Sequence, residues 1–173
     1  MTALRRLWVP LLAGLLVTGV LGAGGGGALA VEPRTVVANV IVPPSAFQPR
    51  TTTEDFYIGS QQLWMVSGSG TFVAPVSFPV AEVRIRKITL YAYDNGTGQV
   101  GLELHRTSPA TGAFAFQGGL STTDAADDPA VGTTTDFAPR LVNTAVHGLV
   151  LELWLSDPSV RVYGVKVTYS YDA

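Results

Sequence analysis

Most of the sequence after residue 30 alternates apolar and polar residues with a period of two. Clusters of Gly, Pro, Asn, Asp and Thr interrupt this alternation at short intervals. The run Leu149–Leu155 has leucine at every second position, and Val100–Leu104 repeats the pattern. Side chains of a strand point alternately to its two faces, whereas helical apolar spacing is missing here. The pattern predicts an all-β fold, a two-sheet antiparallel sandwich of the jelly-roll kind with about eight to ten strands.

The longest run, Ala81–Tyr93, changes its parity part-way. Apolar residues stand at odd positions up to Ile85 and at even positions from Ile88 onward. A slip of one residue turns every following side chain to the other face of a sheet. We therefore predict a β-bulge near Arg86-Lys87.

Two further segments carry turn signals. Asn95-Gly96 stands between alternating runs, and Asn-Gly in that position is a strong hairpin signal. The segment from 118 to 139 is polar and rich in Thr and Asp, so we expect a long loop at one end of the sandwich.

The first thirty residues resemble a secretory signal peptide. Arg5 and Arg6 supply a positive start, Leu7–Leu21 is almost uninterruptedly apolar, and Ala28-Leu29-Ala30 is a small-x-small cleavage site. The alternative is an uncleaved membrane anchor, but this run is interrupted by Pro and Gly and is shorter than the roughly 20 apolar residues that span a bilayer. We expect cleavage after Ala30 and a secreted or cell-surface protein that is not attached to a membrane afterwards. Residues 31–55 then form an N-terminal arm or first strand, and residues 56–173 form the β-sandwich domain.

Charge and cysteine content exclude several functions. Loss of Arg5 and Arg6 with the leader would change the net charge from −2 to −4. Binding to nucleic acids or anionic membranes requires basic clusters, so we expect neither partner. The chain contains no cysteine, which excludes disulfides, thiolate catalysis and cysteine metal sites.

The stretch from Phe72 to Arg106 resembles a group of secreted bacterial β-sandwich domains. In that group Ala-Pro-Val-x-Leu-Pro-x-Gly-Ala-x-Ile precedes a strand ending in aspartate and then Leu-x-Arg. The matching residues here are Ala74-Pro75-Val76-Ser77-Phe78-Pro79, Asp94 and Leu104-His105-Arg106, whereas Val80-Ala81-Glu82 departs from the Gly-Ala pair. The resemblance implies the fold and export, and no activity.

Candidate catalytic residues are few. His105 and His147 are the only histidines, and no Gly-x-Ser-x-Gly motif is present. By its parity His105 is a solvated histidine on the outward face of its strand. Glu103 and Glu152 would be the carboxylate pair if the protein were a glycosidase. We favour the simpler interpretation that they are ordinary charged residues on the surface of a sheet. We expect a protein that is not an enzyme.

An acidic segment offers a possible metal site. Asp124, Asp127, Asp128 and Asp136 lie close together in the sequence, and calcium is bound by such oxygens in loops. Their spacing matches no calcium motif, so solvated turns are the favoured interpretation and no cofactor is expected.

Three aromatic residues are predicted to face outward. Trp154 shares a face with Glu152, and Tyr91 and Tyr93 alternate with apolar residues of their own strand. Exposed aromatic rings stack on sugars, whereas rings covered by an arm or a loop are ordinary packing. A ligand site at Trp154, Tyr91, Tyr93 and Glu152 is therefore a hypothesis to be decided by exposure.

These observations favour a non-catalytic secreted or cell-surface domain with a structural or interaction role. The alternative is a carbohydrate-binding module that uses exposed aromatic residues. Possible partners are a polysaccharide or a second copy of the chain, because the β-branched segment Thr35–Val42 can pair with its own sandwich or with a neighbouring copy. We favour pairing within the chain.

Overall fold

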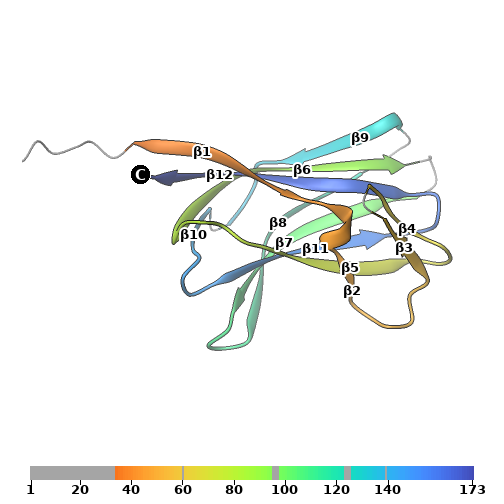
Figure 1. Cartoon of the computed structure of the whole chain (residues 1–173), viewed down its shortest axis with the longest axis horizontal. Coiled ribbons are helices and arrows are strands. Elements are labelled where there is room, and N and C mark those ends of the chain that lie inside the picture. Colours follow the sequence, from red (N-terminus) through yellow and green to blue (C-terminus); the bar gives the residue numbers. More distant parts are fainter. Residues whose placement is uncertain (1–33, 60, 95–97, 123–125, 139) are drawn as a thin grey trace, which may run out of the picture. The chain divides into compact units, whose positions relative to one another are not determined.

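The computed structural model describes residues 34–173 except residues 60, 95–97, 123–125 and 139. The expected leader, residues 1–30, lies outside the described residues. The described strands form two antiparallel sheets that pack face to face (Figure 1), as the alternation predicted. Within this part of the chain, no helix is long and apolar enough to cross a membrane.

The larger sheet has seven strands, with β6 and β12 at its centre. Its strands are β1 (Thr35–Val42), β3 (Phe56–Ile58), β4 (Leu63–Met65), β6 (Glu82–Asp94), β9 (Ala126–Thr134), β10 (Leu141–Asn143) and β12 (Arg161–Asp172). The order is β10-β6-β12-β4-β3, with β9 also on β6 and β1 also on β12.

The smaller sheet has five strands in the order β2-β5-β11-β7-β8. They are β2 (Gln48–Pro49), β5 (Gly70–Val76), β7 (Val100–Ser108), β8 (Ala113–Ser121) and β11 (Gly148–Leu155). A short 3₁₀ turn, η1 (Pro44–Ala46), carries the chain from β1 to β2. Four of the twelve described strands have only two or three residues, so eight long strands remain, which is within the predicted range.

The core lies between the two sheets. Strand β11 contributes Leu149, Leu151, Leu153 and Leu155, all of which are buried, while the residues between them point away from the core. Phe47, which follows η1, is completely buried, so the segment after β1 also packs into the core. The period-two reading of β11 is thus confirmed.

The predicted bulge in β6 is confirmed. Lys87 pairs with Thr168 and Ile85 pairs with Tyr169, so Arg86 is the extra residue on β6. The Arg86 Nε–H group donates a hydrogen bond to Ser170 Oγ over 2.8 Å. Through this bulge Ile85 and Ile88 both face the core although their parity differs.

Two sequence expectations about connections are wrong. Strands β6 and β7 belong to different sheets, so the segment that contains Asn95-Gly96 does not join two paired strands; residues 95–97 themselves lie outside the described residues. The expected loop from 118 to 139 contains the end of β8 and all of β9, which pairs with β6. Strand β9 can be polar because an edge strand pairs through its backbone, and Pro129 is compatible with this position because one side of an edge strand needs no N–H donor.

Strand β1 pairs with β12 along its whole length, from Thr35 opposite Asp172 to Val42 opposite Val165. The segment therefore pairs within its own chain. Its even-numbered residues turn inward and its odd-numbered residues, such as Val37 and Ile41, are exposed.

A tight turn connects β11 to β12. Asp157 Oδ1 accepts hydrogen bonds from the backbone N–H of Ser159, over 2.7 Å, and from the Ser159 hydroxyl. The Ser159 hydroxyl is the main reason that the pKa of Asp157 lies below its ordinary value of 3.8; the Ser159 backbone and the Ser156 hydroxyl add to this, and partial burial opposes it.

Candidate functional site

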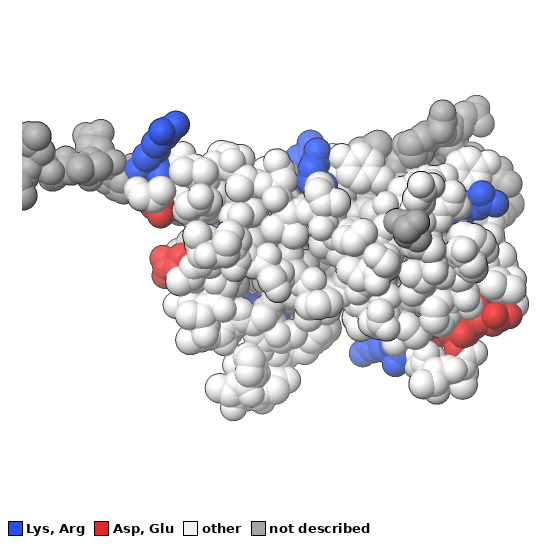
Figure 2. Space-filling model, viewed as in Figure 1, with Lys and Arg blue, Asp and Glu red and all other residues white. Residues whose placement is uncertain are grey.

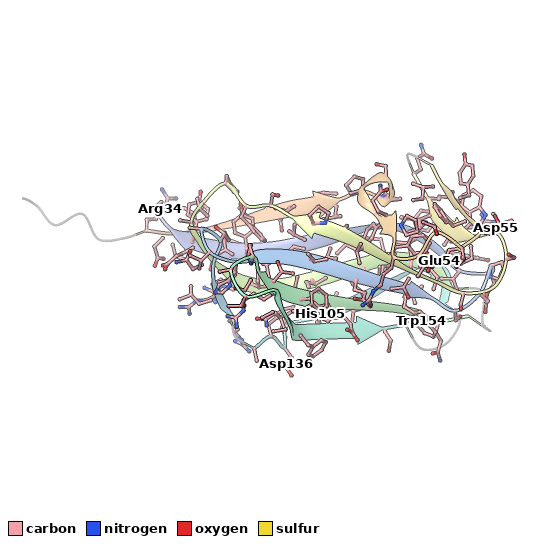
Figure 3. All side chains as sticks on the ribbon, turned by 90° about the horizontal axis from the view of Figure 1, so that it is seen from below. Arg34, Glu54, Asp55, His105, Asp136 and Trp154 are labelled. Carbon is pink, nitrogen blue, oxygen red and sulfur yellow. The ribbon has the colours of Figure 1, made fainter. Side chains whose placement is uncertain are left out.

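The outer face of the five-stranded sheet carries the two candidate residues of β11. Glu152 and Trp154 alternate with buried leucines and point to this face, onto which Figure 3 looks. Trp154 is 41% exposed, which is high for so large an aromatic residue. Sequence parity therefore assigned both residues to the correct side of their strand.

Two glycines on neighbouring strands hollow out this face. Gly101 of β7 lies opposite Trp154, and Gly119 of β8 lies opposite Glu103. Because neither carries a side chain, a groove of about 520 Å³ is left above the sheet. Its lining is formed by Thr71, Gly101, Leu102, Glu103, Phe116, Gly119, Leu120, Ser121, Glu152 and Trp154.

Exposed aromatic rings come to this groove from two strands. Trp154 comes from β11 and Phe116, which is 57% exposed, comes from β8. Gly119 lies close to Phe116, since a Cβ atom there would meet Phe116 Cε2 at 3.4 Å. The groove thus combines flat apolar rings with a floor that lets a ligand approach the backbone.

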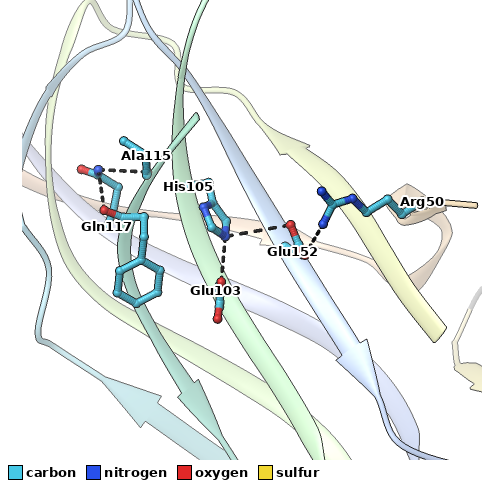
Figure 4. A network of polar contacts seen from close by, with 7 residues as sticks. Arg50, Glu103, His105, Ala115, Gln117 and Glu152 are labelled. Carbon is cyan, nitrogen blue, oxygen red and sulfur yellow. Dashed lines mark hydrogen bonds and ion pairs between the residues drawn. The ribbon is translucent and has the colours of Figure 1, made fainter. Parts of the chain in front are cut away.

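Two carboxylates face each other across the central strands of the groove. Glu103 of β7 pairs directly with Glu152 of β11, an arrangement that is unfavourable for like charges. His105 Nε2 lies 2.9 Å from Glu103 Oε2 and 4.0 Å from Glu152 Oε2 (Figure 4). Arg50, which follows β2, reaches over the sheet and donates from Nη1 to Glu152 Oε1 at 2.7 Å. The histidine and the guanidinium thereby hold both carboxylates in place.

His105 differs from the sequence expectation. It points outward as its parity predicted, but it is only 7% exposed and is therefore not solvated. The Phe114 ring stacks on the imidazole with a centroid distance of 4.2 Å, and Phe116 meets it edge-on. The register between β7 and β8 shifts beside these rings, with Gln117 as the extra residue on β8. The Nδ1 atom of His105 is buried and has no hydrogen-bond partner.

Tyr91 and Tyr93 are not brought together with Trp154. Both lie on β6 in the seven-stranded sheet and are half-buried. Lys166 of β12 places its Nζ atom 5.8 Å from the centre of the Tyr91 ring. The four proposed ligand residues therefore separate into Trp154 with Glu152 on one sheet and the two tyrosines on the other.

The acidic segment does not form a described metal site. Asp136 is exposed, Asp124 lies outside the described residues, and Asp127 and Asp128 belong to β9 but have side chains that are not described. Among the side chains that are described, no group of three or more metal-binding residues is found.

Comparisons with solved structures return β-sandwich domains. A family 35 carbohydrate-binding module from Clostridium thermocellum is 13% identical, with a TM-score of 0.42, over 75% of this chain and 97% of that one. TmCBM27, a carbohydrate-binding module with specific mannan recognition, is 13% identical with a TM-score of 0.40, over 78% and 98% of the two chains. TmCBM61, in complex with β-1,4-galactotriose, is 8% identical with a TM-score of 0.39, over 80% and 88%.

No protein-family model and no curated protein sequence matches the chain. At the identities and TM-scores given above, the likeness says nothing about what this chain binds. Its ligand has to be inferred from its own residues.

Proposed function

We propose that this chain is a non-catalytic extracellular binding domain whose groove on the five-stranded sheet takes a polysaccharide. The observation that carries the proposal is the exposed Trp154 ring beside the glycine floor of Gly101. Sugar rings have one flat apolar face and a polar rim. A ring lying against Trp154 would bury the apolar face, while the groove supplies groups for the rim.

The polar groups of the groove suit uncharged hydroxyls. The half-exposed carboxylate of Glu103 accepts hydrogen bonds, and the carboxylate of Glu152 is fixed in position by Arg50. Both carboxylates would repel an acidic polysaccharide. We therefore assign a neutral polysaccharide to the groove.

The placement of the two carboxylates supports a binding role. A glycosidase needs carboxyl groups on either side of the bond that it cleaves. Glu103 and Glu152 rise from adjacent strands of one floor, so both lie on the same side of a ligand in the groove. Glu152 is also engaged by Arg50.

Surface charge and the expected leader fit the same proposal. Figure 2 shows Lys and Arg side chains scattered singly among uncharged ones in this view, without an extended basic patch. The face shown there therefore offers no basic site for a nucleic acid. Export through the leader of residues 1–30 would bring the domain to polysaccharides outside the cell.

The test replaces one aromatic residue at a time. Affinity electrophoresis through gels that contain neutral polysaccharides (xylan, mannan, β-glucan, galactan) measures binding, and pectate serves as the acidic comparison. We expect Trp154→Ala to weaken binding at least about tenfold, because truncating a central Trp commonly costs about 2 kcal/mol or more.

Tyr57→Ala is the matched control. Tyr57 is also an exposed ring (51%), but it stacks on Trp64 in the seven-stranded sheet. Retained binding in Trp154→Ala with loss in Tyr57→Ala would move the site to the other sheet. Absence of binding to every polysaccharide would leave the domain with a structural or protein-interaction role.

A further inference from the structure

The outer edge of β1 is an unpaired strand edge. Strand β1 lies beside β12 (Figure 1), and within the described part of the chain no strand pairs with its other side. The eight residues Thr35–Val42 contain no charge and no proline. Proteins usually protect edge strands with charges, prolines or bulges, because an open edge is a template for another strand.

The hydrogen-bond pattern shows which residues face that edge. Arg34 and Ala173 exchange both backbone bonds, Arg34 N–H to Ala173 O over 3.4 Å and Ala173 N–H to Arg34 O over 3.0 Å. In an antiparallel ladder such pairs alternate with pairs that make no bond to each other. Even-numbered residues of β1 therefore bond β12, and the backbone groups of the odd-numbered residues point away from it.

The same odd-numbered residues carry the exposed side chains. Val37 is 65% exposed and Ile41 is 64% exposed, with Asn39 between them. The open backbone groups and the exposed apolar side chains thus belong to one set of residues.

We propose that β1 pairs with β1 of a second copy in antiparallel fashion, with Asn39 opposite Asn39 of the second copy. In this register Val37 lies opposite Ile41 of the second copy, and Ile41 lies opposite its Val37. All of these are odd-numbered residues, so their open backbone groups meet and form hydrogen-bonded pairs. Apolar side chains then face apolar ones, and amide faces amide.

The alternatives are less well matched. A register centred on residue 38 would also bring odd-numbered residues together, but it would place Val37 opposite Asn39 and Ile41 opposite Thr35. A different partner would have to bring an extended strand of its own. The second copy brings one by definition, and no like charges oppose it.

The pairing also fixes how the two copies are oriented. The two-fold axis of an antiparallel strand pair stands perpendicular to the sheet, so both copies keep the same face of the joined sheet outward. Both five-stranded sheets then lie on the other side, and the two grooves open in the same direction. Neither the dimer nor the direction of the grooves depends on the proposed polysaccharide binding.

Sedimentation velocity tests the dimer without any ligand. Interfaces below roughly 1,200 Å² give weak complexes, so the exported protein should be measured at about 100 µM. We expect a dimer in the wild type and a monomer in Val37→Lys/Ile41→Lys, where lysines face each other. Val37→Lys/Ile41→Glu should dimerise again, because each lysine then faces a glutamate. A monomeric wild type would overturn the proposal and leave the edge to a strand of another protein.

Single cysteines test the register, since the natural chain has none. Asn39→Cys should form a disulfide-linked dimer on oxidation, because hydrogen-bonded pairs have Cα atoms about 5.5 Å apart, within disulfide range. Val37→Cys is the control: its counterpart would lie four residues along the strand, about 13 Å away, and should not cross-link. Equal cross-linking of the two variants would refute the register.

Discussion

The two glycines of the groove floor should respond to alanine in opposite ways. A Cβ atom on Gly101 would lie 3.5 Å from Trp154 Cε3, which is ordinary contact. A Cβ atom on Gly119 would lie 2.9 Å from the backbone oxygen of Leu102 and 3.2 Å from Glu103 Cγ, so the strands would have to move apart. The same substitution is thus accommodated at one position and resisted at the other.

Gly101→Ala should stabilise the fold by about 0.5–1 kcal/mol, because glycine in a strand loses more chain entropy on folding than alanine does. Gly119→Ala should destabilise it by about 1–3 kcal/mol, the usual cost of forcing extra atoms into a packed site. For a domain of this size the shifts in Tm are roughly 2–4 °C for each kcal/mol.

Polysaccharide affinity distinguishes an effect on the groove from an effect on the stability of the fold. The new methyl group of Gly101→Ala would stand where a ligand approaches the floor, so this more stable variant should bind polysaccharide about tenfold more weakly, equivalent to about 1.4 kcal/mol. Urea denaturation and affinity electrophoresis measure the two quantities. Stability changes of the same sign at both glycines, or undiminished binding by a stabilised Gly101→Ala, would refute the reasoning.

Two other predictions concern stability. Leu151 is completely buried, so Leu151→Ala should lower the free energy of unfolding, measured by urea denaturation, by about 2–5 kcal/mol. Leu141 is 51% exposed, so Leu141→Ala should lower it by less than about 1 kcal/mol. Comparable losses would mean that the core is wrongly assigned. Asp157 has a lowered pKa in the folded state, so the stability that it adds is fully present above its ordinary pKa of 3.8 and is lost as the pH falls through the lowered value. Asp157→Ala should therefore have a lower Tm than the wild type at pH 7, and the difference in Tm should shrink below about pH 4. Ser159→Ala should behave in the same way, because its hydroxyl is the main cause of the lowered pKa. A difference in Tm that does not change with pH would count against this role.

Features that depend on neighbouring residues were predictable from the sequence. The parity change between Ile85 and Ile88 located the bulge at Arg86, because the core requires both side chains on one face. The leucine alternation in β11 placed Glu152 and Trp154 on the outer face for the same reason.

Features that depend on strand pairing were not predictable. Tyr91 and Trp154 both point outward, but the sequence does not say that they belong to different sheets. The burial of His105 requires Phe114 and Phe116 of β8, and their position depends on an extra residue in the partner strand. Polar β9 was missed because an edge strand can pair through its backbone alone.

The groove itself left a trace in the sequence. A glycine within a strand pattern often marks a close approach of another group, and Gly101 stands inside an alternating run, whereas Gly119 lies in the segment that was expected to be a loop. That trace shows where a floor can form, but not which side chains surround it. Arg50 was missed because its contact with Glu152 spans 102 residues of the sequence.

The pairing of β1 with β12 also determines when folding can finish. Thr35 and Asp172, which share a hydrogen bond, are 137 residues apart, and every long strand of the larger sheet has a partner distant in the sequence. Such non-local topologies fold slowly, in milliseconds to seconds, because chain entropy is lost before contacts repay it. On a ribosome, β1 would wait without its partner until residues 161–172, which form β12, had been made.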